Sequence, residues 1–362
     1  MKILVFEWLV GGGIAGDTLI PTSDPFLVQG ASMYGAVLDD CAALGAEVLS
    51  PLDLQYTQAI ANFESLQRYD NLHITPINTT QDLEPVLRSQ AQQADHIFLI
   101  APECEGILSR CLQWLDEFQM KLVCGPQNLI ETFADKNATQ QLLKSKGIPV
   151  PNGTMLSLGV LADDEGLGAR EFIATIEGAA WPLVIKPAAG AGGDNVFLCH
   201  NLDQLNSAAT IVKESGDSIR MEHYVAGTSV SVSIVRNRNE TLLLPGTKQR
   251  FSNMCGRPQP DGFANVNPEP IGHFVDSVYP LNKDQQRRAA ALAGAVAEAF
   301  PQWRGYLGVD MVLADDGCDV VVELNPRLTA SYATIREETG FNLLGFLLLP
   351  NESESLDTIG QP

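Results

Sequence analysis

The segment GVDMVLADDGCDVVVELNPR, residues 308–327, carries oxygen-bearing side chains at a spacing that suits a divalent cation. Two strand-like runs flank Asp316–Gly317, a pair that favours a two-residue type I′ hairpin turn. That register sets Asp310 opposite Glu323 with Cβ atoms about 5 Å apart, and Asn325 on the same face. Opposed carboxylates repel unless a cation lies between them, and two carboxylates with an amide suit Mg²⁺. The alternative is an exposed acidic hairpin.

Two lysines could supply the positive charge that a phosphate ligand needs. Lys186 ends the apolar run PLVIK, and Gly190, Gly192 and Gly193 follow it directly. Such glycines present backbone N–H groups without side chains, as phosphate-binding loops do. Lys136 follows an aspartate that is a good helix N-cap, so it is expected at a helix N-terminus. Taken singly, the loop could be an ordinary glycine turn and Lys136 a surface lysine.

The opening MKILVFEWLVGGGIAG has the spacing of a dinucleotide-binding turn. Gly11–Gly13 and Gly16 satisfy G-x-G-x-x-G after a predicted strand. Such a turn needs a helix that begins within the glycine cluster. Here Pro21 and Pro25 follow, and the first plausible helix spans about 26–44. We therefore predict a long loop, either a strained turn or a loop that lines a substrate site.

The elements that must position these residues alternate between strands and helices. In the first 128 residues this pattern predicts a parallel, wound sheet. The strand-like runs there are KILVFEWL, AEVLSP, DHIFLIAP (95–102) and KLVCGP (121–126). One or two helices are expected over 127–147, and an alanine-rich helix over 283–300. Further strands are expected at 181–187, 218–225, 228–236 and 240–249, before a long loop at 251–272.

Composition limits the classes of partner. The 362 residues are 45% hydrophobic and carry a net charge of −21, which argues against nucleic acid and against an anionic membrane surface. No apolar run approaches the roughly 20 residues of a membrane span. The seven cysteines are dispersed without zinc spacing, as expected of reduced thiols. These features predict a cytoplasmic protein that acts on small molecules.

The order of these motifs resembles the ATP-grasp superfamily of carboxylate–amine ligases. The resemblance rests on Asp135–Lys136, WPLVIKP with its glycine loop, RMEHYVAG and the closing ELNPR. It implies a mixed α/β chain with α+β subdomains, in which a Rossmann-like N-terminal domain precedes the ATP-grasp fold. The implied parts are an N-terminal domain at 1–128, a small lid subdomain at 129–220, a large subdomain at 221–345 and a flexible tail at 346–362.

The resemblance also implies roles for single residues. Lys136 and Lys186 would contact phosphates of ATP. Arg327 would hold the substrate carboxylate or acyl phosphate and, with Lys186, act in catalysis. The implied magnesium ligands, with Mn²⁺ as a possible substitute, are Asp310, Glu323 and Asn325. The other implied ATP contacts are Gly190, Gly192, Gly193, Met221, Glu222, Tyr224 and Val225. Ser229 departs from the family, because many members have a ribose-binding glutamate there, and Glu222 is one replacement.

A closer resemblance concerns the substrates. FEWLVGGG, GTSVSVSIV and VELNPRLTASY are similar to ligases that join L-glutamate to tyramine in methanofuran biosynthesis. The resemblance implies ADP-forming ligation through an acyl phosphate. The residues expected near the carboxylate and amine substrates are Glu7, Gly11, Gly12, Gly13, Gln249, Ser331 and Tyr332. A ligase for other amino acids, a non-catalytic nucleotide-binding regulator and an NAD-dependent oxidoreductase remain alternatives, and a homodimer remains open.

Overall fold

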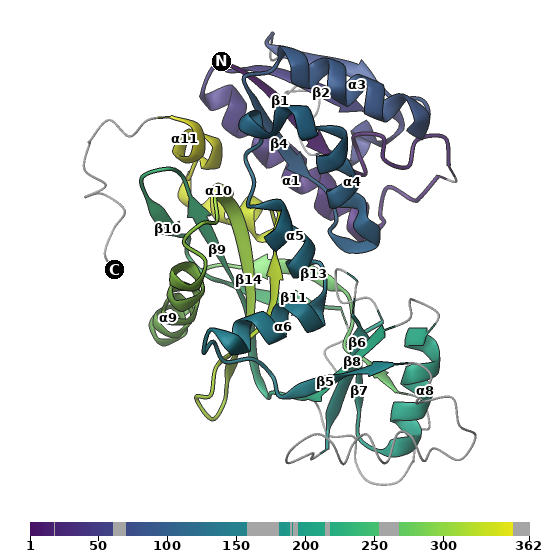
Figure 1. Cartoon of the computed structure of the whole chain (residues 1–362), viewed down its shortest axis with the longest axis vertical. Helices are drawn as coiled ribbons and strands as arrows, with labels where there is room; N and C mark the ends of the chain where they lie inside the picture. Colours follow the sequence, from purple (N-terminus) through teal and green to yellow (C-terminus); the bar gives the residue numbers. More distant parts are fainter. Residues whose placement is uncertain are drawn as a thin grey trace.

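Three β-sheets organise the chain in the computed structural model. The structure describes residues 1–17, 19–60, 70–157, 181–188, 190, 195–213, 218–252 and 268–349. Sheet A lies at the top of Figure 1, sheet C in the middle and sheet B at the lower right. The division at 128, 220 and 345 expected from the sequence remains a proposal; the boundary at 220 falls inside a strand that spans residues 218–223, and residues 269–270 pair with sheet B. Of the tail expected at 346–362, residues 346–348 form the end of a helix, while the part from 350 lies outside the described residues, as do Gly192 and Gly193.

Sheet A is a parallel four-stranded sheet with the order β3-β2-β1-β4. Its strands are β1 (Lys2–Glu7), β2 (Glu47–Leu52), β3 (Leu72–Pro76) and β4 (His96–Ile100). The helical segments around it are α1 (Pro25–Ala43), η1 (Leu54–Ala59), α3 (Thr80–Gln93), η2 (Cys104–Gly106), α4 (Ile107–Trp114) and η3 (Asp116–Lys121). The predicted parallel, wound sheet is therefore present.

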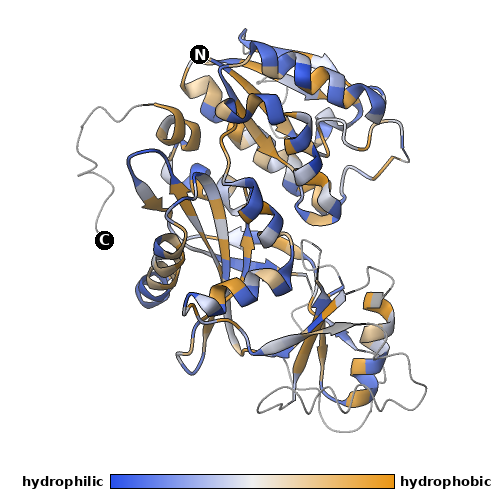
Figure 2. Cartoon of the chain, viewed as in Figure 1, coloured by the Kyte–Doolittle hydropathy of each residue, from blue (hydrophilic) through white to orange (hydrophobic). Residues whose placement is uncertain are grey.

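Alternation along β1 sorts its side chains between two helical layers. Ile3 and Val5 pack with α1, whereas Leu4 and Phe6 pack with α3 and α4. A strand that is covered on both faces has a continuous apolar sequence. For this reason polar and apolar residues do not alternate in KILVF. Figure 2 shows this strand in orange beneath α3, along which blue and orange alternate.

One predicted strand of sheet A is wrong. Residues 121–126 form no strand and make only a single bridge, between Leu122 and Ile97. The ladder cannot continue because Pro126 has no N–H and because Gly125 lies against the Trp303 ring. The fourth strand is instead β3, a half-exposed edge strand whose short pattern LHITP the sequence analysis did not select.

Two short helices lead into sheet B. The predicted helical stretch 127–147 forms α5 (Gln127–Phe133) and α6 (Lys136–Ser145), and Asp135 caps α6 through its side chain. Sheet B has the order β12-β7-β6-β8-β5 and is covered by α8 (Leu202–Lys213). Its strands are β5 (Gly153–Ser157), β6 (Leu183–Pro187), β7 (Phe197–Cys199), β8 (Ser218–His223) and β12 (Glu269–Pro270).

Sheet C is antiparallel and has the order β13-β11-β9-β14-β15, with β10 paired to β9. Its strands are β9 (Gly227–Arg236), β10 (Thr241–Leu243), β11 (Thr247–Phe251), β13 (Phe274–Val278), β14 (Gly305–Ala314) and β15 (Val320–Asn325). Three helices accompany it, namely α9 (Lys283–Ala299), α10 (Ser331–Thr339) and α11 (Leu343–Leu348).

The central strand β9 has two chemically different faces. Val230, Val232 and Ile234 share one hydrophobic cluster with residues of α9. The alternate residues Ser229 and Ser231 therefore point to the opposite face, because successive side chains of a strand alternate between faces. The sequence SVSVSIV thus builds a sheet with an apolar side against α9 and a polar side away from it.

A buried carboxylate joins sheet A to the segment that follows sheet C. Asp40 of α1 is fully buried and accepts hydrogen bonds from Tyr332 Oη at 2.5 Å, Arg336 Nε at 2.7 Å and Leu343 N at 3.0 Å. Burial raises the pKa of Asp40, and the Tyr332 and Arg336 contacts oppose that rise. A buried charge of this kind is tolerated only while its partners remain in place.

We expect Asp40→Asn to lower the free energy of unfolding by about 3 kcal/mol, because it leaves Arg336 without its buried partner. Urea denaturation measures this change. The matched control is Asp39→Asn. The Asp39 side chain is 44% exposed, and its contact with the same Arg336 is longer, at 3.4 Å. That control should cost less than about 1 kcal/mol. Equal losses for the two variants would contradict the structural role of Asp40.

Candidate active site

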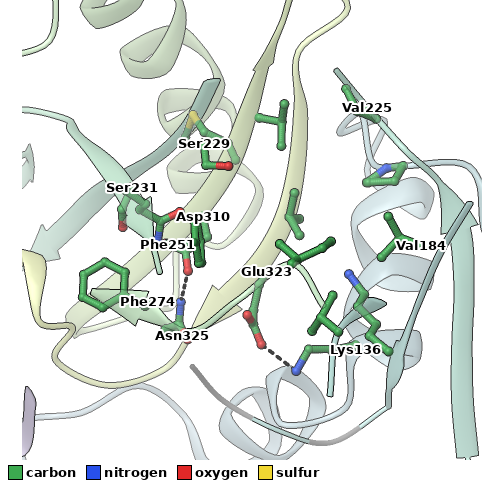
Figure 3. Close-up of a pocket in the computed structure, with 18 of the residues that line it drawn as sticks. Lys136, Val184, Val225, Ser229, Ser231, Phe251, Phe274, Asp310, Glu323 and Asn325 are labelled. Atoms are coloured by element: carbon green, nitrogen blue, oxygen red, sulfur yellow. Dashed lines mark hydrogen bonds and ion pairs between the residues drawn. The ribbon is translucent and has the colours of Figure 1, made fainter. Parts of the chain in front are cut away.

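A cavity of about 270 Å³ lies between sheets B and C. Its walls come from β6 and β8 on one side and from β9, β11, β13, β14 and β15 on the other. Figure 3 shows Asp310, Asn325 and Glu323 on one side of this space and Val184 on the other, with Lys136 joined to Glu323 by a dashed line. Residues distant in sequence therefore meet in one chamber.

The structure brings the three predicted metal ligands together. Asp310 pairs with Glu323 across β14 and β15, as expected, and Asn325 Nδ2 donates to Asp310 Oδ2 at 2.9 Å. The predicted two-residue turn is wrong, however, because β14 ends at Ala314 and β15 begins at Val320. An irregularity in the pairing after Asp310 shifts the register by one residue, which compensates for the longer loop.

The donor set fits a divalent cation. Asp310 Oδ1 is buried and has no hydrogen-bond partner among the described residues. Burial, followed by the charge of Glu323, raises the pKa of Asp310 to about 6. A cation would relieve both costs at once. The described residues contain no cluster of three or more His, Cys, Asp or Glu side chains, so phosphate oxygens and water would complete the coordination.

Lys136 lies where a phosphate or a metal would need space. Its Nζ is 2.8 Å from Glu323 Oε1 and donates to the carbonyl oxygen of Gly190 at 2.5 Å. Burial lowers the pKa of Lys136, but the charge and hydrogen bond of Glu323 together with the charge of Glu103 offset this, and the pKa is raised overall. The ammonium group therefore neutralises one expected metal ligand and contacts the glycine loop.

Lys186 belongs to a buried network of charges on sheet B. Its Nζ is 2.6 Å from Glu222 Oε1, while Glu222 Oε2 accepts from Arg220 Nε at 2.8 Å. Burial lowers the pKa of Lys186. For Glu222, burial acts to raise the pKa, but the charges of Lys186 and Arg220 outweigh it, so the pKa is lowered. Both oxygens of Glu222 are thus engaged, which leaves it poorly suited to contact a ribose.

The other predicted ATP contacts fall into three groups. Tyr224 and Val225 line the cavity just after β8, beside Glu222. The side chain of Met221 points into the core of sheet B, so a contact with ATP would come from its backbone and remains a prediction. Gly190 lines the cavity, with φ of +155°, whereas Gly192 and Gly193 lie outside the described residues.

Arg327 is held by a residue that the sequence analysis did not select. Its Nε donates to Glu103 Oε2 at 2.6 Å, and Nη2 lies 3.4 Å from Oε1. Glu103 follows the carboxyl end of β4 and is only 5% exposed. Polar residues at the carboxyl ends of parallel strands commonly face a ligand site, a signal that could have identified Glu103. The pair joins sheet A to the cavity.

Some of the predicted substrate residues line the cavity, whereas others are buried away from it. Gln249 and Ser331 line the cavity. Tyr332 is fully buried and donates to Asp40, and it does not belong to the lining. Glu7 is also buried, with a pKa raised by burial to about 7, and its Oε2 accepts from Val10 N at 2.8 Å. A substrate role for Glu7 and Tyr332 remains a prediction without a cavity contact among the described residues.

The opening glycines form a tight turn. Gly11 N donates to Glu7 O at 2.8 Å, and Gly13 N donates to Trp8 O at 2.7 Å. A Cβ on Gly12, whose φ is +98°, would lie 2.5 Å from Ile77. Helix α1 begins only at Pro25, as expected, so no helix N-terminus meets the glycines. The turn is tightly packed by its own neighbours, and none of its three glycines lines the cavity.

Other lining residues were not selected from the sequence. They include Gln29 from α1, Ser231 from β9, and Ser277 and Phe274 from β13. The alternating serines of β9 were a readable signal for a polar face, whereas the contribution of Gln29 depends on how α1 is placed against sheet C.

Two parts of the sequence match known domain families. Residues 133–331 match the profile of the ATP-grasp domain, and residues 62–128 match that of the pre ATP-grasp 3 domain. The N-terminal section of the carbamoyl phosphate synthase large chain from Aquifex aeolicus is 22% identical over 231 residues, which cover 63% of this chain and 38% of that protein. The chain thus spans well under half the length of this curated relative.

Every helix among the described residues is too short or too polar to cross a bilayer.

Solved structures share the fold. D-alanine–D-alanine ligase from Bacillus anthracis superposes with a TM-score of 0.60 at 18% identity, covering 95% of each chain. Biotin carboxylase from Campylobacter jejuni gives 0.65 at 15% identity, covering 97% of this chain and 72% of that one. These likenesses confirm the predicted α/β class with an ATP-grasp fold. Because the profile match extends over more than half of the sequence, this protein belongs to the ATP-grasp family.

Proposed function

We propose that this protein is an ATP-dependent, ADP-forming ligase that joins a carboxylate to an amine. The observation that carries the proposal is the convergence of Asp310, Glu323, Asn325, Lys136 and Lys186 on one cavity. Cations and oxygen ligands in this arrangement suit a nucleoside triphosphate with its metal. The ATP-grasp family assignment supports the same reading.

The proposed reaction has two steps. The γ-phosphoryl group of ATP passes to the substrate carboxylate, which yields an acyl phosphate and ADP. The amine then attacks the acyl carbon, phosphate leaves with the C–O bond electrons, and the amine loses a proton to give the amide. The chain contributes positioning and charge neutralisation, since this chemistry needs no protein nucleophile.

Single residues have distinct tasks in this proposal. Asp310, Glu323 and Asn325 would hold Mg²⁺, or Mn²⁺ in its place, which when bound neutralises phosphate charge. Lys136 and Lys186 would bind phosphate oxygens; beyond their contacts with the described residues, Lys136 has one N–H donor for this and Lys186 has two. Arg327 would orient the substrate carboxylate. Glu103 holds its Nε and Nη2, so its Nη1 would make that contact, although Nη1 also lies 3.2 Å from Leu328 O.

For the substrates we propose L-glutamate and tyramine, or a similar amine, in a pathway of the methanofuran type. The sequence resemblance described above supports this choice. The cavity offers Gln249, Ser331 and the aromatic rings of Phe251 and Phe274 for an amine of that kind.

Mg-ATP should stabilise the protein, because a ligand that binds only the native state does so by mass action. At 100 times its Kd the gain is about 2.7 kcal/mol, which corresponds to a rise in Tm of several degrees. NADH should give no rise, because no helix N-terminus meets the opening glycines. A thermal-shift titration that responds to NADH and not to Mg-ATP would overturn the proposal.

Lys136→Met should uncover Glu323 and let Mg²⁺ alone raise Tm more than in the wild type. The same variant should bind ATP about tenfold more weakly, because a charge-assisted contact to phosphate is lost. Lys144→Met is the matched control, since Lys144 lies exposed in the last turn of the same helix. If all three proteins respond equally to Mg²⁺, Lys136 does not compete with the metal.

Incubation with ATP, Mg²⁺, L-glutamate and tyramine should release ADP and phosphate and yield a product lighter than the two substrates by one water. Mass spectrometry measures the product, and omission of either substrate should abolish it. Arg327→Ala should suppress turnover while ATP still binds. If tyramine is inert and another amine is ligated, the ligase proposal stands and the tyramine proposal fails. If no amine supports ADP release, a nucleotide-binding regulator becomes the better account.

A further inference from the structure

A second pocket, of about 300 Å³, lies apart from the cavity between sheets B and C. Its walls come from α6 and the edge strand β5, together with Arg220 of β8, and we call it the α6–β5 pocket. None of the described residues that line it also lines the cavity. The charged residues among them are Lys144 and Arg220, with no aspartate or glutamate. In a chain with a net charge of −21, this composition favours a negatively charged ligand.

Arg220 has hydrogen-bonding capacity left for such a ligand. Its Nε donates to Glu222 Oε2 at 2.8 Å, and its Nη1 donates to Asn137 Oδ1 at 3.2 Å. Its Nη2 donates to Gln140 Oε1 and lies 3.4 Å from Pro151 O. A guanidinium group carries five N–H bonds. Within the part of the chain that the structure describes, one N–H of Nη1 therefore has no acceptor.

Asn137 contributes a second donor without a partner. The residue lines the α6–β5 pocket and is only 4% exposed, and its Nδ2 has no hydrogen-bond partner among the described residues. The amide cannot be turned around, because its Oδ1 is the acceptor for Arg220 Nη1. A buried donor without an acceptor is costly. The two free donors are adjacent, so the two oxygens of one oxyanion could satisfy both.

The buried charges next to this pocket do not balance. Arg220, Glu222 and Lys186 are each at most 4% exposed. The two cations share one carboxylate, because Lys186 Nζ lies 2.6 Å from Glu222 Oε1 and Arg220 Nε lies 2.8 Å from Oε2. No second carboxylate among the described residues pairs with either cation. Since unbalanced buried charge is costly, an anion beside Arg220 would stabilise this group.

Lys144 provides a mobile cation at the same pocket. It lies on the face of α6 that carries Asn137 and Gln141, because residues three and four apart in a helix are neighbours. Its side chain is exposed and forms no ion pair with another described residue. Its ammonium group is therefore available to a ligand that Arg220 and Asn137 hold from below.

We infer that the α6–β5 pocket is a second binding site, which takes a small oxyanion and is linked to the cavity through Arg220 and Glu222. Phosphate and carboxylate are two sources of this chemistry. The binding itself does not depend on the proposed ligase activity, whereas the linkage rests on the proposed binding of a nucleotide in the cavity.

The sign of the linkage follows from the shared carboxylate. An anion that neutralises Arg220 leaves Glu222 more strongly paired with Lys186, and it also lowers the positive potential around Lys186. Both effects weaken the contact of Lys186 with a nucleotide phosphate. Occupation of the α6–β5 pocket should therefore weaken nucleotide binding, and a nucleotide should weaken anion binding by the same factor.

Calorimetric titration of the nucleotide-free protein tests the site. Inorganic phosphate and succinate are titrated separately, and sodium chloride of equal ionic strength controls for screening. The wild type should bind one of these anions saturably. Lys144→Met should weaken that binding about tenfold, because a charge-assisted contact is lost, and Lys144→Arg should restore most of it. The matched control is Lys146→Met, which should bind as the wild type does, since Lys146 caps the same helix but does not line the pocket.

A non-hydrolysable Mg-ATP analogue then tests the linkage. Its apparent Kd should rise about fivefold as the anion saturates and should then stay constant, because two linked sites give a ceiling. Direct competition inside the cavity gives a rise without a ceiling. In Lys144→Met the rise should need about ten times more anion.

The outcomes keep this site separate from the ligase proposal. Equal anion binding by the wild type and Lys144→Met, or no saturable binding of either anion, overturns the site. Anion binding that depends on Lys144 but leaves the Kd of the analogue unchanged supports the site and overturns the linkage, as does a rise without a ceiling. If no nucleotide binds at all, the proposed function fails, and the titrations of the nucleotide-free protein still decide the site.

Discussion

The structure depends on the pairing of buried cations with carboxylates around one cavity. A site for a triphosphate needs lysine and arginine, yet an unpaired buried charge is too costly to keep. Lys136 pairs with Glu323, Lys186 with Glu222, and Arg327 with Glu103. These pairs also join parts of the fold, because Lys136 reaches from α6 to β15 and Arg327 reaches back to the end of β4. Charge compensation and domain assembly are therefore served by the same contacts.

Because these cations are already paired, a bound nucleotide must exchange contacts as well as add them. Glu323 is the clearest case, since in its proposed metal role it would share its carboxylate between the metal and Lys136 Nζ, which lies 2.8 Å from Oε1. Lys136 also contacts the carbonyl oxygen of Gly190, so this exchange would also affect the contact with Gly190. Glu222 is different, because Arg220 and Lys186 engage both of its oxygens and keep it part of the scaffold.

The polar face of sheet C and the opening turn show how similar sequence signals lead to different outcomes. The serines of β9 alternate with aliphatic residues, so one set packs with α9 while Ser229 and Ser231 line the cavity. The glycines after β1 look more like a ligand loop in sequence, yet they close a turn so tight that a Cβ on Gly13 would overlap the Trp8 ring. Their main requirement is close backbone packing.

The sequence by itself determined the classes of element and the chemistry of the cavity wall. Apolar runs specified β1, β4 and β6, because buried parallel or central strands leave little room for polar residues. The pairing of Asp310 with Glu323 was also readable, although a bulge and a longer loop produce it. Only the tertiary structure decided which carboxylate compensates which cation. Glu103 and Arg327 are 224 residues apart, and neither local pattern nor propensity encodes a contact between separate sheets. The same reason hid Gln29, because its place in the cavity wall depends on how layers pack and not on the residues next in sequence.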